Sequence, residues 1–157
     1  MSATPGTTAS GLPLYAAALQ DVPARVLYEL LKLRVDVFVV EQECAYPELD
    51  GRDLEPDAVL LWAQDAAGRV AGTVRLLREP DGTARVGRVA TAREARGRGV
   101  AADLVRRALE LAGDVEVVLG AQAHLEHWYA RFGFVADGPA YAEDGIPHVP
   151  MRRARGA

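Results

Sequence analysis

One segment of the chain has residue types and spacing that predict an anion-binding site. A strand-like run, Val86–Thr91, is followed by the turn Arg96-Gly97-Arg98-Gly99 and then by a helical apolar pattern over residues 99–112. A helix that begins directly after such a turn directs unpaired backbone N–H groups and the positive end of its dipole toward one point. Glycine at positions 97 and 99 lets a ligand approach the backbone closely. We therefore expect this segment to bind a phosphate or pyrophosphate.

The two best-known phosphate motifs do not fit this segment. A P-loop requires a lysine after its second glycine, and the only lysine of the chain is Lys32. A dinucleotide-binding loop requires a third glycine where Ala102 stands, and a strand that opens a βαβ unit rather than one that ends a meander. The remaining alternative is a glycine-containing helix entry with solvated arginines.

Charge is distributed unevenly along the 157 residues, whose net charge is −4. Seven arginines lie between Arg85 and Arg107, whereas seven acidic residues lie between Glu41 and Asp57. An acidic protein with one basic segment favours a small anionic ligand over a nucleic-acid surface. The acidic segment, if it lies at the mouth of the site, favours a cationic amine as the second ligand; exchange of Asp50 and Asp53 for Asn would test this.

Composition excludes several further classes of protein and of binding site. Cys44 is the only cysteine, which excludes disulfides and cysteine-based zinc sites and fits a reducing compartment. The first twelve residues lack the features of a signal peptide, and no apolar run is long enough to span a membrane. His124 and His127 have no recognisable third metal ligand nearby. We expect a cytoplasmic protein with no metal, no membrane association and no nucleic-acid partner.

The pattern of elements predicts one α+β domain over residues 13–157 behind a disordered tail, residues 1–12. The expected sheet is mixed, mostly antiparallel and flanked by helices. Strands are expected at 14–19, 58–64, 70–78, 83–90, 115–119, 134–137 and 148–153, and helices from residue 25 to about 38, at 99–112 and at 123–132.

Several motifs, taken in this order, resemble the GCN5-related N-acetyltransferases (GNAT). Arg96-x-x-Gly99-x-Ala101 is similar to the acetyl-CoA signature of that family, and Tyr129 followed by Phe132-Gly133-Phe134 is similar to its second hallmark. Three further runs resemble the ElaA-like subgroup: residues 37–42, 120–124 and 143–148. The order of the elements also matches the family over nearly the whole chain, so the GNAT acyl-CoA N-acyltransferase fold is implied.

The resemblance implies how acetyl-CoA would bind as co-substrate. The backbone of Val89, Ala90 and Thr91 would pair with the pantetheine arm as a further strand would. The backbone N–H groups of the turn and the first residues of the helix would hold the pyrophosphate, and Arg93, Arg96 or Arg98 would add positive charge. The residues of this turn and helix start are Arg96, Gly97, Arg98, Gly99, Val100 and Ala101. Gln122 stands where many relatives have a cofactor-binding Asn.

The resemblance also implies that Tyr129 protonates the departing CoA thiolate. A phenol of pKa about 10 stays protonated at neutral pH, and a thiol of pKa about 8.5 leaves as the anion. The alternative for Tyr129 is a buried helix tyrosine with no role in catalysis.

The general base that deprotonates the amine stays open among three residues. Glu41 is the first choice, because it follows the apolar end of a helix, where burial would raise its pKa. His148 is the second choice, since imidazole titrates near neutral pH, and Glu143 is the third. These three residues are also the candidate acceptor-binding residues, and a water chain is a further route for the proton.

Other side chains are expected near the acceptor. Arg75 and Arg88 are candidates to point inward from the sheet, and Arg88 stands where some relatives carry an acidic base. Trp62, Trp128 and Tyr141 are candidates to wall the pocket, although large aromatics are more often core residues.

The leading hypothesis is an N-acetyltransferase that moves an acetyl group from acetyl-CoA to a primary amine, in a small molecule or a peptide, within a ternary complex. The main alternative is a CoA-binding module with little catalysis. A nucleic-acid-binding protein and a relative of the acyl-homoserine-lactone synthases, suggested by residues 37–42, are weaker alternatives. Apolar residues near the last strand would allow a homodimer.

Overall fold

The computed structural model describes residues 8–157, so residues 1–7 of the predicted tail lie outside the described residues. Residues 8–12 lie against the first turn of helix α2 (Val100–Ala112). There the carboxylate of Asp103 accepts hydrogen bonds from the backbone N–H of Ala9 at 3.0 Å and of Ser10 at 2.9 Å. These contacts attach the segment before the first strand to the domain.

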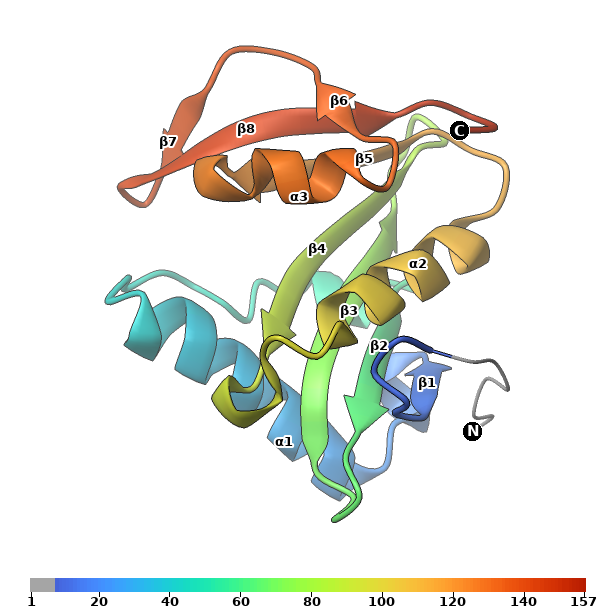
Figure 1. The fold of residues 1–157 in the computed structure, drawn as a ribbon, viewed down its shortest axis with the longest axis vertical. Coiled ribbons are helices and arrows are strands. Elements are labelled where there is room, and N and C mark those ends of the chain that lie inside the picture. The colour runs from blue at the N-terminus through green and yellow to red at the C-terminus, as the bar shows by residue number, and fades with distance from the viewer. Residues whose placement is uncertain (1–7) are drawn as a thin grey trace.

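Eight strands and three α-helices form the described chain (Figure 1). The strands are β1 (Leu14–Ala17), β2 (Val59–Gln64), β3 (Val70–Arg78), β4 (Ala84–Thr91), β5 (Val117–Gln122), β6 (Val135–Ala136), β7 (Tyr141–Glu143) and β8 (Ile146–Arg153). The α-helices are α1 (Ala24–Val35), α2 and α3 (Glu126–Ala130). Shorter helical segments are η1 (Leu19–Asp21), η2 (Asp36–Glu41), η3 (Arg52–Leu54), η4 (Arg93–Ala95) and η5 (Ala123–Leu125).

All eight strands belong to one sheet of order β1-β2-β3-β4-β5-β8-β6, with β7 also paired to β8. Only β4 and β5 run parallel, and they are paired at two positions, Ala84 with Val117 and Arg85 with Val118. Beyond that corner the two strands diverge, and Figure 1 shows the sheet opening between them. The backbone of each strand is therefore without a sheet partner along the opening.

Helices cover both faces of the sheet. Helix α2 packs on β2, β3 and β4, and its buried side chains Leu104 and Val105 join the larger apolar core. Helix α1 lies on the opposite face, where Leu30 packs with Leu60 and Trp62 in a second core. The alternation of apolar residues along β2 and β3 supplies both cores, because neighbouring side chains of a strand point to opposite faces.

A bulge bends β4 where it borders the opening. Three residues of β3, from Thr73 to Arg75, lie opposite four of β4, from Gly87 to Ala90. Arg88 takes a backbone φ of 51° in this bulge, a conformation that L residues rarely adopt. The bulge turns β4 away from β5 and directs Arg88 toward the opening.

The predicted fold class is confirmed, and several local features differ from expectation. Leu19, expected in the first strand, lies in η1, and β5 runs from Val117 to Gln122 rather than over residues 115–119. The expected helix over residues 123–132 is divided into η5 and α3. Strand β7, which forms a hairpin with β8, was not predicted, because all three of its residues are exposed and show no apolar alternation.

The first helix ends at Val35 and continues as the wider π-helical segment η2, in which the N–H of Gln42 bonds the carbonyl of Val37. Crowding by the β-branched residues of this segment explains the loosened turn. Within residues 8–157, none of the helices combines the length and apolar character needed to cross a bilayer.

Candidate active site

A cleft of about 860 Å³ occupies the opening between β4 and β5. Its walls are β4 and the start of α2 on one side, and β5, α3 and the β7–β8 hairpin on the other. The cleft brings together nearly all the predicted site residues from distant parts of the chain: Glu41, Val89, Ala90, Thr91, Arg96, Gly97, Gly99, Val100, Ala101, Gln122, Tyr129, Glu143 and His148. Arg98 is the exception, since it lies exposed on the turn and does not line the cleft.

Backbone groups along β4 alternate between the sheet and the cleft. The N–H of Ala92 donates to Ala71 of β3, and Ala90 is paired with Thr73. Since successive residues of a strand direct their N–H and C=O groups to opposite sides, Ala90 faces β3, whereas Thr91 and Val89 face the cleft. The predicted pairing with an extended ligand therefore falls on Val89 and Thr91, and the backbone of Ala90 is used by the sheet.

The turn before α2 forms one end of the cleft. Gly97 and Gly99 have φ values of 79° and 81°, which only glycine adopts without strain. Gly99 is the N-cap of α2, and no side chain of residues 8–157 caps the first N–H groups of this helix. These free donors and the helix dipole make this end suitable for an anion, as the sequence predicted.

Glu41 lies at the same end, between two arginines of the turn. Its carboxylate accepts two hydrogen bonds from Arg96, at 3.0 and 2.9 Å, and its Oε1 lies 3.0 Å from Nε of Arg93. The hydrogen bonds from Arg96, helped by the charge of Arg93, lower the pKa of Glu41 below its usual range. The expected rise in the pKa of Glu41 is therefore wrong, because two guanidinium groups outweigh the partial burial, and this carboxylate is a weaker base than expected.

Tyr129 lies on the wall opposite β4 and is 7% exposed. Its ring packs edge-on against Trp128, with centroids 4.8 Å apart, and against Phe134, at 6.1 Å. Its hydroxyl makes no hydrogen bond within residues 8–157, and burial raises the pKa of Tyr129 to about 12. The phenol is thus protonated throughout the neutral range and has a proton to donate into the cleft.

His148 and Gln122 are neighbours on the wall formed by β5 and β8. They are paired in register, and the Gln122 amide donates to Gln42 at 3.2 Å. Nδ1 of His148 lies 2.8 Å from the carbonyl oxygen of Ile146. A hydrogen bond donated there places the proton on Nδ1 and leaves the lone pair of Nε2 free to accept another.

The ring of His148 is held on its other side by the β7 strand. It stacks on Tyr141 with centroids 5.6 Å apart and 23° between the planes, and its Nε2 lies 3.8 Å from the carboxylate of Glu143. Gly120 makes this stack possible, because a Cβ there would overlap the Tyr141 hydroxyl. Tyr141 and Trp128 line the cleft as predicted, but Trp62 does not. Trp62 is fully buried in the second core, where it stacks on Tyr15, so its predicted place in the pocket wall is wrong.

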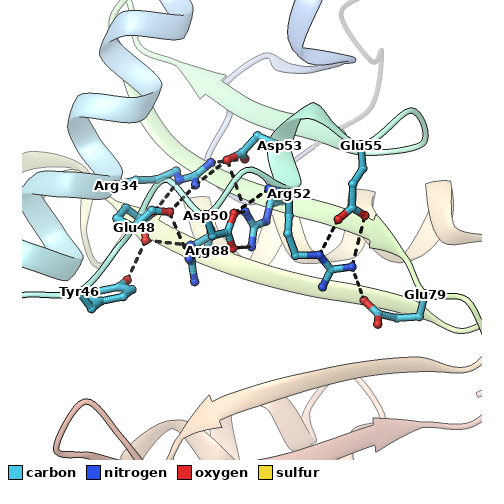
Figure 2. A network of polar contacts seen from close by, with 10 residues as sticks. Arg34, Tyr46, Glu48, Asp50, Arg52, Asp53, Glu55, Glu79 and Arg88 are labelled. Atoms are coloured by element: carbon cyan, nitrogen blue, oxygen red, sulfur yellow. Dashed lines mark hydrogen bonds and ion pairs between the residues drawn. The ribbon is translucent and has the colours of Figure 1, made fainter.

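The acidic segment folds onto arginines rather than facing the cleft as free charge (Figure 2). Glu48 lies 2.6 Å from Nε of Arg34 and 2.8 Å from Nε of Arg88, and Asp50 binds both terminal nitrogens of Arg75 at 2.9 and 3.0 Å. A second group, seen at the right of Figure 2, joins Arg52 to Glu55 and Glu79, and it is linked to the first through the backbone N–H of Arg52, which donates to Asp50 at 3.0 Å. Five of the seven acids that suggested a cationic acceptor are therefore paired with arginines within the protein: Glu41, Glu48, Asp50, Asp53 and Glu55.

Arg85 and Tyr46 are two of the cleft residues that were not identified as site residues from the sequence. Nothing in their local pattern marks them, because each reaches the cleft through sheet pairing or the path of a long loop. Arg85 stands three residues before Arg88 on β4, and in a regular strand this odd spacing would place the two side chains on opposite faces. Both line the cleft because the bulge at Arg88 interrupts the alternation, so the expected inward direction of Arg88 gave no signal for Arg85.

Residues 33–155 match the family described as "Acetyltransferase (GNAT) domain". The chain belongs to the GNAT acetyltransferases. It is 51% identical to UPF0039 protein Rv2851c of Mycobacterium tuberculosis over 137 residues, which cover 85% of this chain and 88% of that protein. It is 42% identical to ElaA of Escherichia coli over 135 residues, covering 81% of this chain and 86% of ElaA. The ElaA-like subgroup is thus confirmed.

Solved structures agree with this assignment. The crystal structure of an acyl-CoA N-acyltransferase from Pseudomonas aeruginosa superposes with a TM-score of 0.85 at 44% identity, covering 91% of this chain and 99% of that one. The E. coli ElaA structure superposes with a TM-score of 0.84 at 35% identity, covering 90% and 99%. GNAT enzymes use acyl-CoA, and the cleft offers the groups that this substrate requires. The turn before α2 supplies N–H donors for phosphate, and the unpaired edge of β4 supplies partners for amides.

Proposed function

We propose that this GNAT enzyme transfers an acetyl group from acetyl-CoA to a primary amine, directly within a ternary complex. One observation supports this most: a single cleft has the phosphate-binding turn at one end and the buried, protonated Tyr129 on its wall. Cys44, the only cysteine, is buried, and its Sγ lies 3.4 Å from the carbonyl oxygen of Asp144. Cys44 borders the cleft, but burial and the charges of Asp144 and Glu143 raise the pKa of its thiol, which disfavours the nucleophilic thiolate. Direct transfer is therefore the route that needs no further group.

Acetyl-CoA would be held chiefly by main-chain groups. The N–H groups from Gly97 to Ala101 bind the pyrophosphate, and the outward groups of Val89 and Thr91 pair with the amides of pantetheine. Arg96 donates through Nε to the carbonyl of Thr91 at 3.1 Å while its terminal nitrogens bind Glu41. Arg96 must therefore exchange these partners when the pyrophosphate and pantetheine occupy the cleft.

Two side chains then handle the protons of the reaction. The amine nitrogen attacks the carbonyl carbon of the thioester, and Nε2 of His148 accepts the proton that the amine loses. Tyr129 donates its proton to the sulfur as the carbon–sulfur bond breaks, so that free thiol leaves. The burial that raises the pKa of Tyr129 also disfavours a thiolate beside it, which makes the sulfur more basic and favours this transfer.

Exchange of Tyr129 for Phe tests the proposal. Because it removes one hydroxyl proton donor and keeps the ring, we expect kcat to fall by about 10² or more, with the KM for acetyl-CoA nearly unchanged. Release of thiol from acetyl-CoA is followed with a panel of amines, polyamines and peptides. Tyr28→Phe is the matched control, since that side chain is 72% exposed on α1.

Two outcomes would contradict the proposed function. Equal rates for the wild type and Tyr129→Phe would remove the tyrosine from the mechanism. Tight CoA binding with no thiol release from any amine would instead identify a CoA-binding module.

A further inference from the structure

A second set of polar groups lines the cleft at the end where β4 and β5 meet, away from the phosphate-binding turn. Arg85 and Arg88 both line the cleft, on either side of Gly87. A Cβ at Gly87 would meet nothing within 4 Å, so the space between the two arginine backbones is open. Both arginines therefore line the same cleft, and the space beside Gly87 is open.

In each of these arginines, Nε lies beside a carboxylate, and at least one terminal nitrogen makes no hydrogen bond with the described residues. Arg88 lies with Nε 2.8 Å from Glu48 and Nη2 3.2 Å from Asp50, and Arg85 donates through Nε to Glu79 at 3.3 Å. Within residues 8–157, Nη1 of Arg88 and both terminal nitrogens of Arg85 make no hydrogen bond. Anchored guanidinium groups with free N–H groups are suited to bind a further anion at little entropic cost.

The opposite wall of the cleft adds a hydroxyl donor, that of Tyr141. The Tyr141 ring lies over Gly120 and stacks on His148, and its hydroxyl makes no hydrogen bond with any described residue. Tyr141 and Arg85 both line the cleft. Burial and the negative charge of Glu143 raise the pKa of Tyr141, and the charge of Arg85 lowers it by less. Tyr141 thus stays protonated and available as a donor.

We propose that Arg85, Arg88 and Tyr141 bind a carboxylate of the acceptor, so that the acceptor is an amine that carries a carboxylate, as an amino acid does. The proposal rests on the proposed function, because it assigns the other end of the acceptor to His148. A carboxylate held between the β4 arginines and Tyr141 leaves the amine beside Nε2 of His148, which stacks on that tyrosine. This reverses the charge expected of the acceptor from the acidic segment alone.

Binding of reaction products tests the carboxylate site without turnover. The full chain, saturated with CoA, is titrated calorimetrically with a panel of N-acetyl amino acids and with their carboxamides, which differ only in the charged group. We expect the acids to bind at least tenfold more tightly than the matching amides. Equal affinity of acids and amides, or no measurable binding by any acid, would overturn the proposal.

Three variants locate the effect. Arg85→Gln and Arg88→Gln should each reduce the acid-over-amide preference to about twofold or less while CoA affinity stays unchanged. Arg25→Gln, whose side chain is 92% exposed on α1, removes the same charge elsewhere and should keep the full preference. Unchanged CoA affinity also shows that each variant is folded, and Arg85→Gln is decisive because Arg85 binds Glu79 and contacts neither Glu48 nor Asp50, the carboxylates that hold Arg88. A full preference in both β4 variants would overturn the assignment.

Kinetics separates this proposal from the proposed function. Thiol release from acetyl-CoA is compared for free amino acids and the amines that lack their carboxylate. Turnover with both series at equal KM would overturn the carboxylate site and leave the transferase intact. A preference for acids in binding, with no thiol release from any amine, would overturn the transferase and leave the site.

Discussion

Two groups of arginines lie in and around the cleft, and they differ in what surrounds them. Arg34, Arg75 and Arg88 form the deep group, whose guanidinium charges are matched by Glu48, Asp50 and Asp53. Arg93 and Arg96 form the turn group, and they share the single carboxylate of Glu41. The side chain of Arg34 is 1% exposed, whereas that of Arg93 is 75% exposed.

The difference shows how burial divides one residue type between two tasks. A buried ion pair cannot exchange its partner for water, so the deep group holds the loop, α1 and the sheet together permanently. An exposed pair is worth little by itself, so the turn group can exchange Glu41 for the phosphates of a ligand at small cost.

The largest effect is expected in the deep group. Glu48→Gln removes a buried charge that contacts Arg34, Arg88 and, at 2.7 Å, the hydroxyl of Tyr46. Because Arg34 would keep only Asp53 and Arg88 only Asp50 as carboxylate partner, we expect the free energy of unfolding to fall by about 3 kcal/mol, the lower end of the range for breaking a buried ion pair. Thermal unfolding should show a midpoint lowered by roughly 10 °C. Glu110→Gln, which breaks an exposed pair with Arg107, is the control and should change the midpoint little.

An intermediate effect is expected from acid. Burial alone would raise the pKa of Asp50, but hydrogen bonds from Arg75 and from the backbone of Arg52 lower it to about 2. The folded chain therefore binds this proton less readily than the unfolded chain, whose value is near 3.8. The resulting stability, roughly 2 kcal/mol, is present above about pH 4 and lost as the pH falls toward 2. Asp53 titrates in the same direction, because Arg34 lowers its pKa against the effect of burial.

Urea unfolding between pH 6 and pH 2 measures this dependence. Asp50→Asn should lower stability at pH 6 and flatten the curve below pH 4. An acid limb as steep in Asp50→Asn as in the wild type would show that Asp50 does not carry it.

The smallest effect on stability is expected in the turn group. Glu41→Gln should change the free energy of unfolding by less than about 1 kcal/mol, since its pairs are exposed. The KM for acetyl-CoA should fall several-fold, because Arg93 and Arg96 would no longer be engaged by a competing carboxylate. A loss of kcat by 10² or more would instead return Glu41 to the role of general base.

Local features of the site were predictable from the sequence, and long-range ones were not. The turn at Gly97 and Gly99 and the position of Tyr129 before Phe132 depend on neighbouring residues, so pattern and resemblance identified them. The contacts of Glu48 with Arg34 and Arg88 join residues 14 and 40 positions apart. Charge counting along the chain therefore described an acidic segment, whereas folding produced a neutral network.

The choice of His148 among the candidate bases and the side chains at the acceptor end of the cleft could not be predicted, for the same reason. The tautomer of His148 depends on the carbonyl of Ile146, and the place of Tyr141 depends on the missing Cβ of Gly120. Neither relation is visible in a pattern of residue types. The raised pKa expected for Glu41 was wrong because Arg96 lies 55 residues away in the chain yet binds it directly.

The two-residue pairing of β4 with β5 has a consequence for how such an enzyme can diversify. The opening is a gap in the main-chain hydrogen-bonding of the sheet, so its existence depends on the strand register and the bulge rather than on any side chain. Side chains on its rim, such as Arg85 and Tyr141, can be exchanged without closing it. The same scaffold can therefore keep one acyl donor and acquire new acceptors through a few substitutions at one end of the gap.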